Sequence, residues 1–301
     1  MAFAFTLIDC QMPRISLVPT LLRELLIQPQ FPREPEPDLV MDDDEQVQAY
    51  SAAGRVDGVM SASYLFNSAR ISSTIAGSKR VLDLGCGPAT QLAQVARLNP
   101  DVSFVGVDLS KEMLVSAQAH VTALGLGNVA FMEGDITSLP QIEDGSFDSV
   151  ICTMALHHLP TIDHLDSCFA EIRRILRPDG ATYLVDFSRM KSLKSVLFFA
   201  YMNRKHDPHL FSLDYERSLR AAFHCDDFRA VASKRLPGYV QHYTTFGIPI
   251  IQLLKSPDRE LSADAKLTLK QMRQNLIPKY RRELDDQRFF FWLSGLRNDP
   301  F

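Results

Sequence analysis

Two acidic residues and two glycines in this sequence have the types and the spacing of a nucleoside-binding site. Asp83 precedes Gly85 and Gly87, and Asp108 follows them after roughly 20 residues. Glycines at 85 and 87 let a ligand approach the backbone, because a Cβ would occupy that space. A carboxylate at the tip of the next strand can accept hydrogen bonds from both ribose hydroxyls. Each feature alone fits a tight turn or a helix cap, whereas the four together predict a nucleoside site.

The residues around the glycines indicate which nucleoside binds. A dinucleotide site needs a third glycine where this chain has Thr90, and Pro88 removes a backbone N–H that a pyrophosphate would use. Asp83 would repel a pyrophosphate, but it suits a ligand that carries ammonium and sulfonium charges. The pattern therefore predicts S-adenosylmethionine.

The motif formed by Asp83, Gly85 and Gly87 resembles that of the class I S-adenosylmethionine-dependent methyltransferases, with Ala89 in place of their usual third glycine. The resemblance implies an α/β fold, a Rossmann-like, doubly wound, mostly parallel seven-stranded sheet with a terminal antiparallel hairpin. It also implies contacts of Asp135 and Ile136 with the adenine. The predicted cofactor-binding residues are Asp83, Gly85, Cys86, Gly87, Asp108, Leu109, Met113, Asp135, Ile136 and Thr153.

Two adjacent histidines are the best acid–base candidates. His157 and His158 follow the fourth predicted strand, in a segment, 153–160, that would border the transferred methyl group. With its flanks NVAFMEGD and EIRRILRPDG, this segment resembles the quinone-biosynthesis C-methyltransferases and other small-molecule methyltransferases. Resemblance to phosphoethanolamine and cyclopropane fatty acid relatives favours His158 as the catalytic residue. A structural histidine is the alternative, and Tyr50 and Tyr64 are further candidates for reaching the site.

No metal site is expected from the spacing of the cysteines and histidines. The pair His157 and His158 has no third ligand nearby in the sequence. His206 and His209 could hold a metal in space, but a polar turn is the favoured interpretation of that segment.

Strands and helices must alternate to position these residues. Helical periodicity and short apolar runs bounded by turn residues distinguish the two. Strands are predicted over 81–84, 102–107, 129–133, 147–154 and 181–187, and helices over 89–98, 111–124, 162–176 and 226–236. Residues 177–180 are expected to break the chain between a helix and a strand, and a hairpin is expected around Phe246 and Gly247. The alternation predicts a parallel sheet covered on both faces.

Three regions are predicted along the chain. Residues 1–78 are expected to form a helical N-terminal cap, with an amphipathic helix over 15–27 and a proline-rich, extended linker over 28–38. Residues 79–255 are the predicted methyltransferase domain. Within it, 188–225 are an aromatic-rich insertion, interpreted as a flap over the ligand cleft or a dimer surface. Residues 256–301 are a predicted C-terminal helical extension.

The composition excludes several classes of protein. The 301 residues are 46% apolar, which supports a sizeable core. The net charge of −4 makes nucleic acid an unexpected partner. Five widely spaced cysteines predict reduced thiols in a cytoplasmic protein. There is no signal-peptide pattern and no run of membrane-spanning length. A homodimer through the cap, the flap or the tail is compatible with these regions.

The leading functional prediction is methyl transfer to a small, partly apolar or aromatic acceptor. Transfer from a sulfonium is an in-line displacement, so positioning can supply most of the acceleration and a base is optional. Residues 153–156 lack the Asn/Asp-Pro-Pro-Tyr/Phe motif of nucleobase N-methylation. The alternatives are a protein or peptide methyltransferase, and a regulatory protein that binds the cofactor without turnover.

Overall fold

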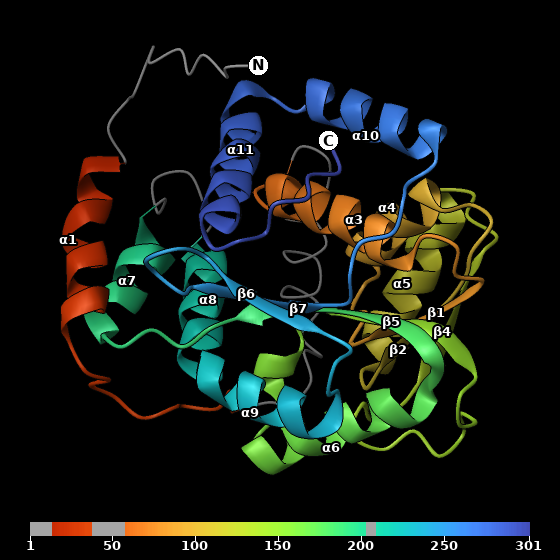
Figure 1. Ribbon diagram of the computed structural model, residues 1–301, viewed down its shortest axis with the longest axis horizontal. Helices are drawn as coiled ribbons and strands as arrows, with labels where there is room; N and C mark the ends of the chain where they lie inside the picture. Colours follow the sequence, from red (N-terminus) through yellow and green to blue (C-terminus); the bar gives the residue numbers. More distant parts are fainter. Residues whose placement is uncertain (1–13, 38–57, 203–208) are drawn as a thin grey trace.

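A seven-stranded sheet forms the centre of the computed structural model, which describes residues 14–37, 58–202 and 209–301 (Figure 1). The strand order is β3-β2-β1-β4-β5-β7-β6. The strands are β1 (Arg80–Leu84), β2 (Ser103–Asp108), β3 (Val129–Glu133), β4 (Phe147–Thr153), β5 (Leu176–Phe187), β6 (Gln241–Thr244) and β7 (Ile251–Lys255). Strands β1 to β5 pair in parallel, whereas β7 is antiparallel to β5 and β6. The predicted fold class, including the terminal hairpin, is confirmed.

Helices cover both faces of the sheet. On one face α3 (Ser61–Ile75), α4 (Thr90–Leu98), α5 (Lys111–Ala123) and α11 (Pro278–Leu293) share one apolar core with the sheet. On the other face α6 (Ile162–Ile175) and α9 (Cys225–Arg235) build a second core (Figure 1). The remaining elements are α1 (Arg14–Leu26), the 3₁₀ turn η1 (Leu156–His158), α7 (Leu193–Tyr201), α8 (His209–Ala221) and α10 (Ala263–Asn275).

Side-chain caps fix where the helices nearest the site begin. Ser110 precedes α5, and its hydroxyl accepts a hydrogen bond from Met113 N at 3.1 Å. Thr161 caps α6 in the same way, through His164 N. Such caps satisfy backbone donors that have no partner in the first turn. Both helices therefore start directly after the loops that follow β2 and β4.

One predicted boundary is wrong. Residues 177–180 do not separate a helix from a strand, because β5 already starts at Leu176. The strand pairs Phe147 with Leu176 and then Ser149 with Ala181, so the Arg-Pro-Asp-Gly sequence forms an irregularity inside the β4–β5 ladder. Pairing with β4 has overridden the local turn preference.

Among the described residues outside the sheet, helices form where the sequence predicts them. Helix α1 covers the expected amphipathic stretch, and residues 28–37 have no regular secondary structure. The tail forms α10 and α11, and the Phe291 ring stacks on Phe66 of α3 with centroids 5.2 Å apart. The three-region division of the chain stays a prediction. The candidates Tyr50 and His206 lie outside the described residues.

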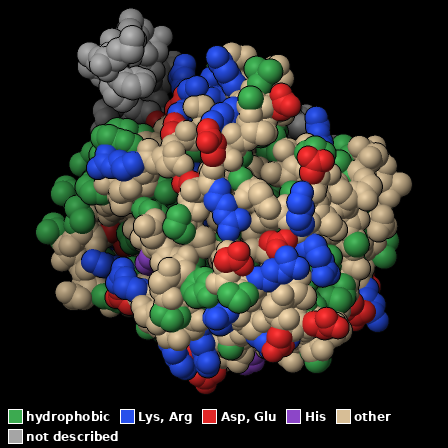
Figure 2. Space-filling model, turned by 45° about the vertical axis from the view of Figure 1, so that its right-hand side comes forward, with side chains coloured by type: hydrophobic (Ala, Val, Ile, Leu, Met, Phe, Trp, Pro, Cys, Tyr) green, Lys and Arg blue, Asp and Glu red, His purple; other side chains and the backbone are tan. Residues whose placement is uncertain are grey.

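Charges of both signs are interspersed over the face that Figure 2 shows, without a large field of one sign. Within the described residues, none of the helices combines the length and the apolar character that crossing a membrane requires.

Candidate active site

A cavity of about 440 Å³ lies at the carboxyl ends of the parallel strands. This is where the strand order reverses between β1 and β4, and open α/β sheets place ligands at such a point. The cavity has the size of a small-molecule site. The predicted residues that line it are Gly85, Gly87, Asp108, Leu109, Met113, Asp135, Ile136, His157 and His158. A small neighbouring cavity is lined by Cys86 and Thr153 together with the two glycines.

The glycine loop between β1 and α4 turns sharply beneath this cavity. Gly85 has a φ of +67°, and a Cβ there would lie 2.4 Å from the Cβ of Ala155. Gly85 is therefore required by the close approach of the loop after β4. Gly87 has a φ of +52°, and a Cβ there would meet no protein atom. Ala89, at the position of the expected third glycine, has a φ of 58°, so a non-glycine residue adopts the left-handed conformation here.

The Asp108 carboxylate joins the two loops at the tip of β2. Its Oδ2 accepts a hydrogen bond from Gly87 N at 2.7 Å, and its Oδ1 accepts one from Ser110 N at 3.0 Å. Burial raises the pKa of Asp108, although these two bonds oppose the shift. Since a carboxylate offers about four acceptor positions, capacity remains for the two hydroxyls of a ribose. Ser110 is the cap of α5, so the Asp108 carboxylate is not needed for that role.

The surroundings of the Asp83 side chain indicate whether the site fits S-adenosylmethionine. It is buried under the glycine loop, and its Oδ1 has no hydrogen-bond partner within the described part of the chain. Burial and the charge of Asp108 both raise its pKa well above the usual value. A buried carboxylate without a partner is costly, and a nearby cation removes that cost. The residues therefore fit a ligand that brings positive charge, as the ammonium and sulfonium groups do.

We expect cofactor binding to release a proton from Asp83. The positive charges of the ligand lower the raised pKa of this carboxyl, so binding is tighter above that pKa and weakens as the pH falls through it. Each pH unit between the free and bound pKa values changes the affinity by up to about tenfold. Calorimetry in two buffers of different ionisation enthalpy measures the released proton. Asp83→Asn should abolish the release and Asp135→Asn should keep it; equal release from wild type and Asp83→Asn would contradict the prediction.

The residues predicted to contact adenine, Asp135 and Ile136, line the cavity together with Leu109 and Met113. Met113 is buried, whereas Leu109 is 43% exposed and available to a flat ring. Asp135 is exposed, and its Oδ1 accepts hydrogen bonds from the backbone N and the hydroxyl of Thr137. Only its second oxygen is therefore open to a ligand. Cys86 is buried, and burial raises the pKa of its thiol well above the usual value, which keeps it protonated.

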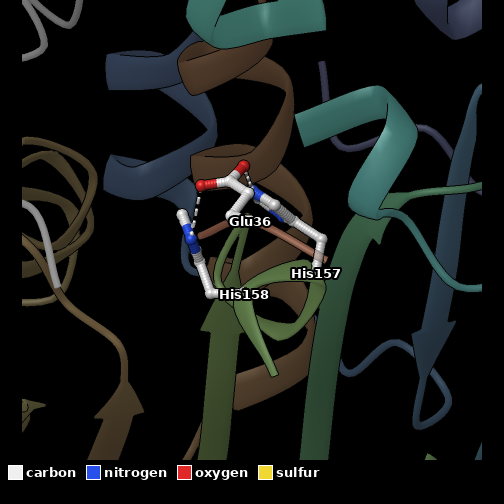
Figure 3. Close-up of side chains that lie close together, drawn as sticks. All are labelled: Glu36, His157 and His158. Atoms are coloured by element: carbon white, nitrogen blue, oxygen red, sulfur yellow. Dashed lines mark ion pairs between the residues drawn. The ribbon is translucent and has the colours of Figure 1, made fainter. Parts of the chain in front are cut away.

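The two histidines differ in their surroundings. His157 is buried, and its Nδ1 donates to Asp186 Oδ1 at 2.6 Å while its backbone N donates to Asp186 Oδ2 at 2.9 Å. Burial disfavours its charged form, but the charge and the hydrogen bond of Asp186 outweigh this and raise the pKa of His157. The His158 side chain is 24% exposed and faces the carboxylate of Glu36, with Nδ1 3.0 Å from Oε2 (Figure 3).

Glu36 is a site residue that the sequence did not reveal. It lies in the proline-rich linker, yet its carboxylate lies between both histidines and accepts a hydrogen bond from Ser218 Oγ at 2.9 Å. Burial opposes the charged form, but His158, His157 and Ser218 together lower the pKa of Glu36 to about 2. One acid in a linker composed of proline and charged residues carries no local signal of this role.

Arg33 holds the same linker against the site. We call residues 29–37 the strap. The Arg33 guanidinium donates to the carbonyls of His157, Leu159, Pro160 and Ala221, and it lies 3.7 Å from the centre of the Phe223 ring. Burial lowers the pKa of Arg33 to about 10, so the group keeps its charge at neutral pH.

Aromatic side chains from the insertion complete the wall on the histidine side. Phe199 of α7 and Phe211 and Tyr215 of α8 line the cavity, together with Phe187 at the end of β5. Tyr64, named as a candidate from the sequence, is buried and lines the small neighbouring cavity. Asp186 and Phe187 could have been predicted, since they too end a parallel strand.

The sheet order, the glycine loop and the acid at the end of β2 define the fold of the class I methyltransferases. Residues 75–212 match the family model described as "Methyltransferase domain". The match covers slightly less than half of the chain, and over that part the predicted resemblance to methyltransferases is confirmed.

Individual relatives match the same region. An uncharacterized methyltransferase, YcgJ of Bacillus subtilis, is 36% identical over 131 residues, which are 43% of this chain and 49% of that protein. The demethylmenaquinone methyltransferase of Geobacillus kaustophilus is 34% identical over 112 residues, 37% of this chain and 46% of the relative. The chain therefore spans about half the length of these relatives.

Solved structures share the fold at low sequence identity. A SAM-dependent methyltransferase from Aquifex aeolicus has a TM-score of 0.51 at 14% identity and covers 72% of this chain and 98% of its own. The plantazolicin methyltransferase BpumL, solved with SAH, has a TM-score of 0.54 at 14% identity and covers 72% of this chain and 91% of its own.

Proposed function

We propose that this protein transfers a methyl group from S-adenosylmethionine to a small, partly apolar or aromatic acceptor. The proposal rests on one observation: the two ends of the cavity differ in their chemistry. At one end lie the Asp108 carboxylate and the glycine loop, and the buried Asp83 carboxylate precedes this loop without being among the residues that line the cavity. At the other end lie aromatic side chains and the exposed edge of His158. The first end suits a cationic nucleoside and the second an apolar molecule with an ionisable group.

The residues of the chain would mainly position the two reactants. When bound, S-adenosylmethionine supplies a methyl group on its sulfonium, and the acceptor atom displaces the sulfur in line. Asp108 would hold the ribose and Asp83 the ammonium, while the aromatic wall formed by Phe199, Phe211 and Tyr215 would orient the acceptor and exclude water. Holding the reacting atoms in line can supply most of the rate enhancement.

His158 is the proposed base when the acceptor must lose a proton. It lines the cavity, and the Glu36 carboxylate would stabilise the imidazolium that results. His157 is the poorer candidate because its side chain is buried, whereas that of His158 is partly exposed. We therefore assign His157 to positioning and His158 to the acceptor.

Substitution His158→Ala is expected to lower turnover about a hundredfold while the affinity for S-adenosylmethionine stays nearly unchanged. Single-turnover rates and calorimetric cofactor affinities measure the two effects separately. His164→Ala is the matched control, because His164 also lines the cavity but its Nδ1 is bonded to Thr161 Oγ1. Equal turnover in His158→Ala and the wild type would dispose of the base role.

The acceptor class can be tested with S-adenosylmethionine labelled in its methyl group. The protein is incubated with fractionated cell extract, and the label is followed into small molecules, polypeptides and nucleic acid. We expect label in the apolar small-molecule fraction. Label in the polypeptide fraction would support the protein or peptide alternative, and cofactor binding with no label in any fraction would support a regulatory protein without turnover.

A further inference from the structure

Three potential ligand groups meet beside the cavity, on the acceptor side. Glu36 comes from the strap, and His157 and His158 come from η1, and one ligand atom of each lies within 4.8 Å of the others (Figure 3). The Glu36 Oε1 atom is 3.8 Å from His157 Nε2, and its Oε2 atom is 3.0 Å from His158 Nδ1. Two imidazoles and one carboxylate are a common ligand set for divalent transition metals.

We propose that Glu36, His157 and His158 bind one divalent transition-metal ion, whose open coordination position faces the methyl acceptor. The distance of 3.8 Å between Glu36 and His157 Nε2 is too long for a hydrogen bond. Ligand atoms about 2.0–2.2 Å from a tetrahedral ion lie roughly 3.3–3.6 Å apart. The two observed distances, 3.0 and 3.8 Å, fall on either side of that range but end on different oxygens of Glu36. Rotation of the carboxylate and a small movement of the imidazoles would therefore bring one ligand atom of each residue onto one ion.

Neighbouring side chains already hold the ligands in the orientation that a metal requires. Asp186 accepts the Nδ1 proton of His157, which directs the Nε2 atom toward Glu36. A carboxylate behind a histidine is the usual second partner at a metal site, because it fixes the tautomer and makes the ligand more basic. Ser218 similarly donates to Glu36 Oε1. The contact with Asp186 leaves His157 Nε2 open to an ion, whereas Ser218 bonds to the Glu36 oxygen that faces His157.

The charges around the cluster favour a cation. The carboxylates of Glu36, Asp186 and Asp214 act on His157, and those of Asp186, Glu36 and Asp227 act on Arg33. The two guanidinium groups of Arg33 and Arg189 oppose these four carboxylates, so the carboxylates are in excess.

A second group of potential ligands in the described residues does not have these properties. His224, Cys225 and Asp226 are consecutive in the sequence, and the His224 ring caps α9 by accepting from Asp226 N. Asp226 is exposed and also pairs with Arg229. We therefore assign no metal ion to this second cluster, and it serves as a control.

The metal site deepens the proposed methyl transfer, on which it rests, by naming the acceptor class. An ion at this end of the cavity would coordinate a hydroxyl or phenol oxygen and lower its pKa, so that its proton leaves to solvent. The C–S bond of the donor then breaks as the new C–O bond forms, and the acceptor is methylated on oxygen. With the ion bound, the His158 nitrogen that faces Glu36 carries the metal in place of a proton. The ion then replaces His158 as the group that activates the acceptor, so the base role proposed above applies to the metal-free protein.

Cobalt binding tests the proposal without reference to turnover. Metal-free full-length protein is titrated with Co²⁺, and both the visible absorption bands and the calorimetric stoichiometry are recorded. We expect one tightly bound Co²⁺ per chain. Glu36→Ala and His158→Ala should each weaken binding at least a hundredfold, and Asp186→Asn about 10- to 100-fold.

Two matched controls should leave the cobalt affinity unchanged. Glu34→Ala removes a neighbouring acid of the strap, which pairs with Arg220 at 3.0 Å, and His224→Ala removes the second cluster. Melting curves and S-adenosylmethionine affinity show that each variant is folded. The proposal is overturned if wild type binds no Co²⁺, or if Glu36→Ala and His158→Ala bind it as wild type does. Cofactor binding without cobalt binding would refute only the metal site, whereas cobalt binding without cofactor binding would refute only the proposed methyl transfer.

Discussion

Replacing Asp108 by alanine is expected to weaken S-adenosylmethionine binding about a thousandfold. Two hydrogen bonds from ribose hydroxyls to a carboxylate are lost, and each such bond contributes roughly 2 kcal/mol. The effect should be large because Asp108 is largely buried at the tip of β2, where water cannot easily replace it. Calorimetric titration of the purified variant measures the loss.

Two further variants separate ligand binding from damage to the loop. Asp108 also accepts from Gly87 N and Ser110 N, so the alanine variant leaves two backbone donors without partners. Asp108→Asn keeps one acceptor oxygen and should lose less affinity. Asp135→Ala, at the exposed rim, should change affinity only severalfold. An Asp108→Ala protein that melts as wild type does and binds the cofactor equally well would show that this carboxylate does not hold the ribose.

Arg33→Ala is expected to destabilise the protein by about 3 kcal/mol, because four carbonyl oxygens lose their donor and each buried unpaired group costs roughly 1–3 kcal/mol. Because water partly reaches these carbonyls, the total falls below the roughly 4–12 kcal/mol that four fully buried unpaired groups would cost. The melting temperature should fall by roughly 6 °C or more.

Lysine at position 33 should not restore the stability, since a single ammonium cannot reproduce the planar fork of donors. Arg229→Ala is the control. This arginine is exposed and pairs with Asp226 on the same helix, so its loss should change stability by less than about 0.5 kcal/mol. If Arg33→Ala melted as wild type does, the strap would contribute nothing to the stability of the fold.

The cofactor end of the site was predictable because its residues are close in sequence and follow strand ends. Asp83, Gly85 and Gly87 belong to one turn, and Asp108 ends the adjacent strand, so the βαβ geometry alone brings them together. The same rule applied to β5 would have identified Asp186. Assignment of individual roles to these residues stays a prediction.

The acceptor end could not be predicted in the same way, because it joins segments that are distant in sequence. The Arg33 side chain reaches carbonyls 124 to 188 residues away, and no local pattern marks that pairing. The expectation that no metal binds rested on sequence spacing, in which Glu36, the third ligand of the metal site proposed above, is far from the two histidines. The β5 boundary was missed for a related reason, since pairing with β4 outweighs the turn preference of residues 177–180.

The packing of α11 on α3 has a consequence for the order in which the protein folds. Arg70 of α3 donates to the carbonyl of Asn298, a contact that spans 228 residues of sequence, and Phe66 stacks on Phe291. Helix α3 also carries Tyr64 and Asn67, which line the small cavity beside the glycine loop. Closing so long a loop is slow. Strands β1 to β5 can therefore assemble during synthesis before α11 packs on α3. The methyl donor should therefore bind only late in folding, after the segment that contains α11 has left the ribosome.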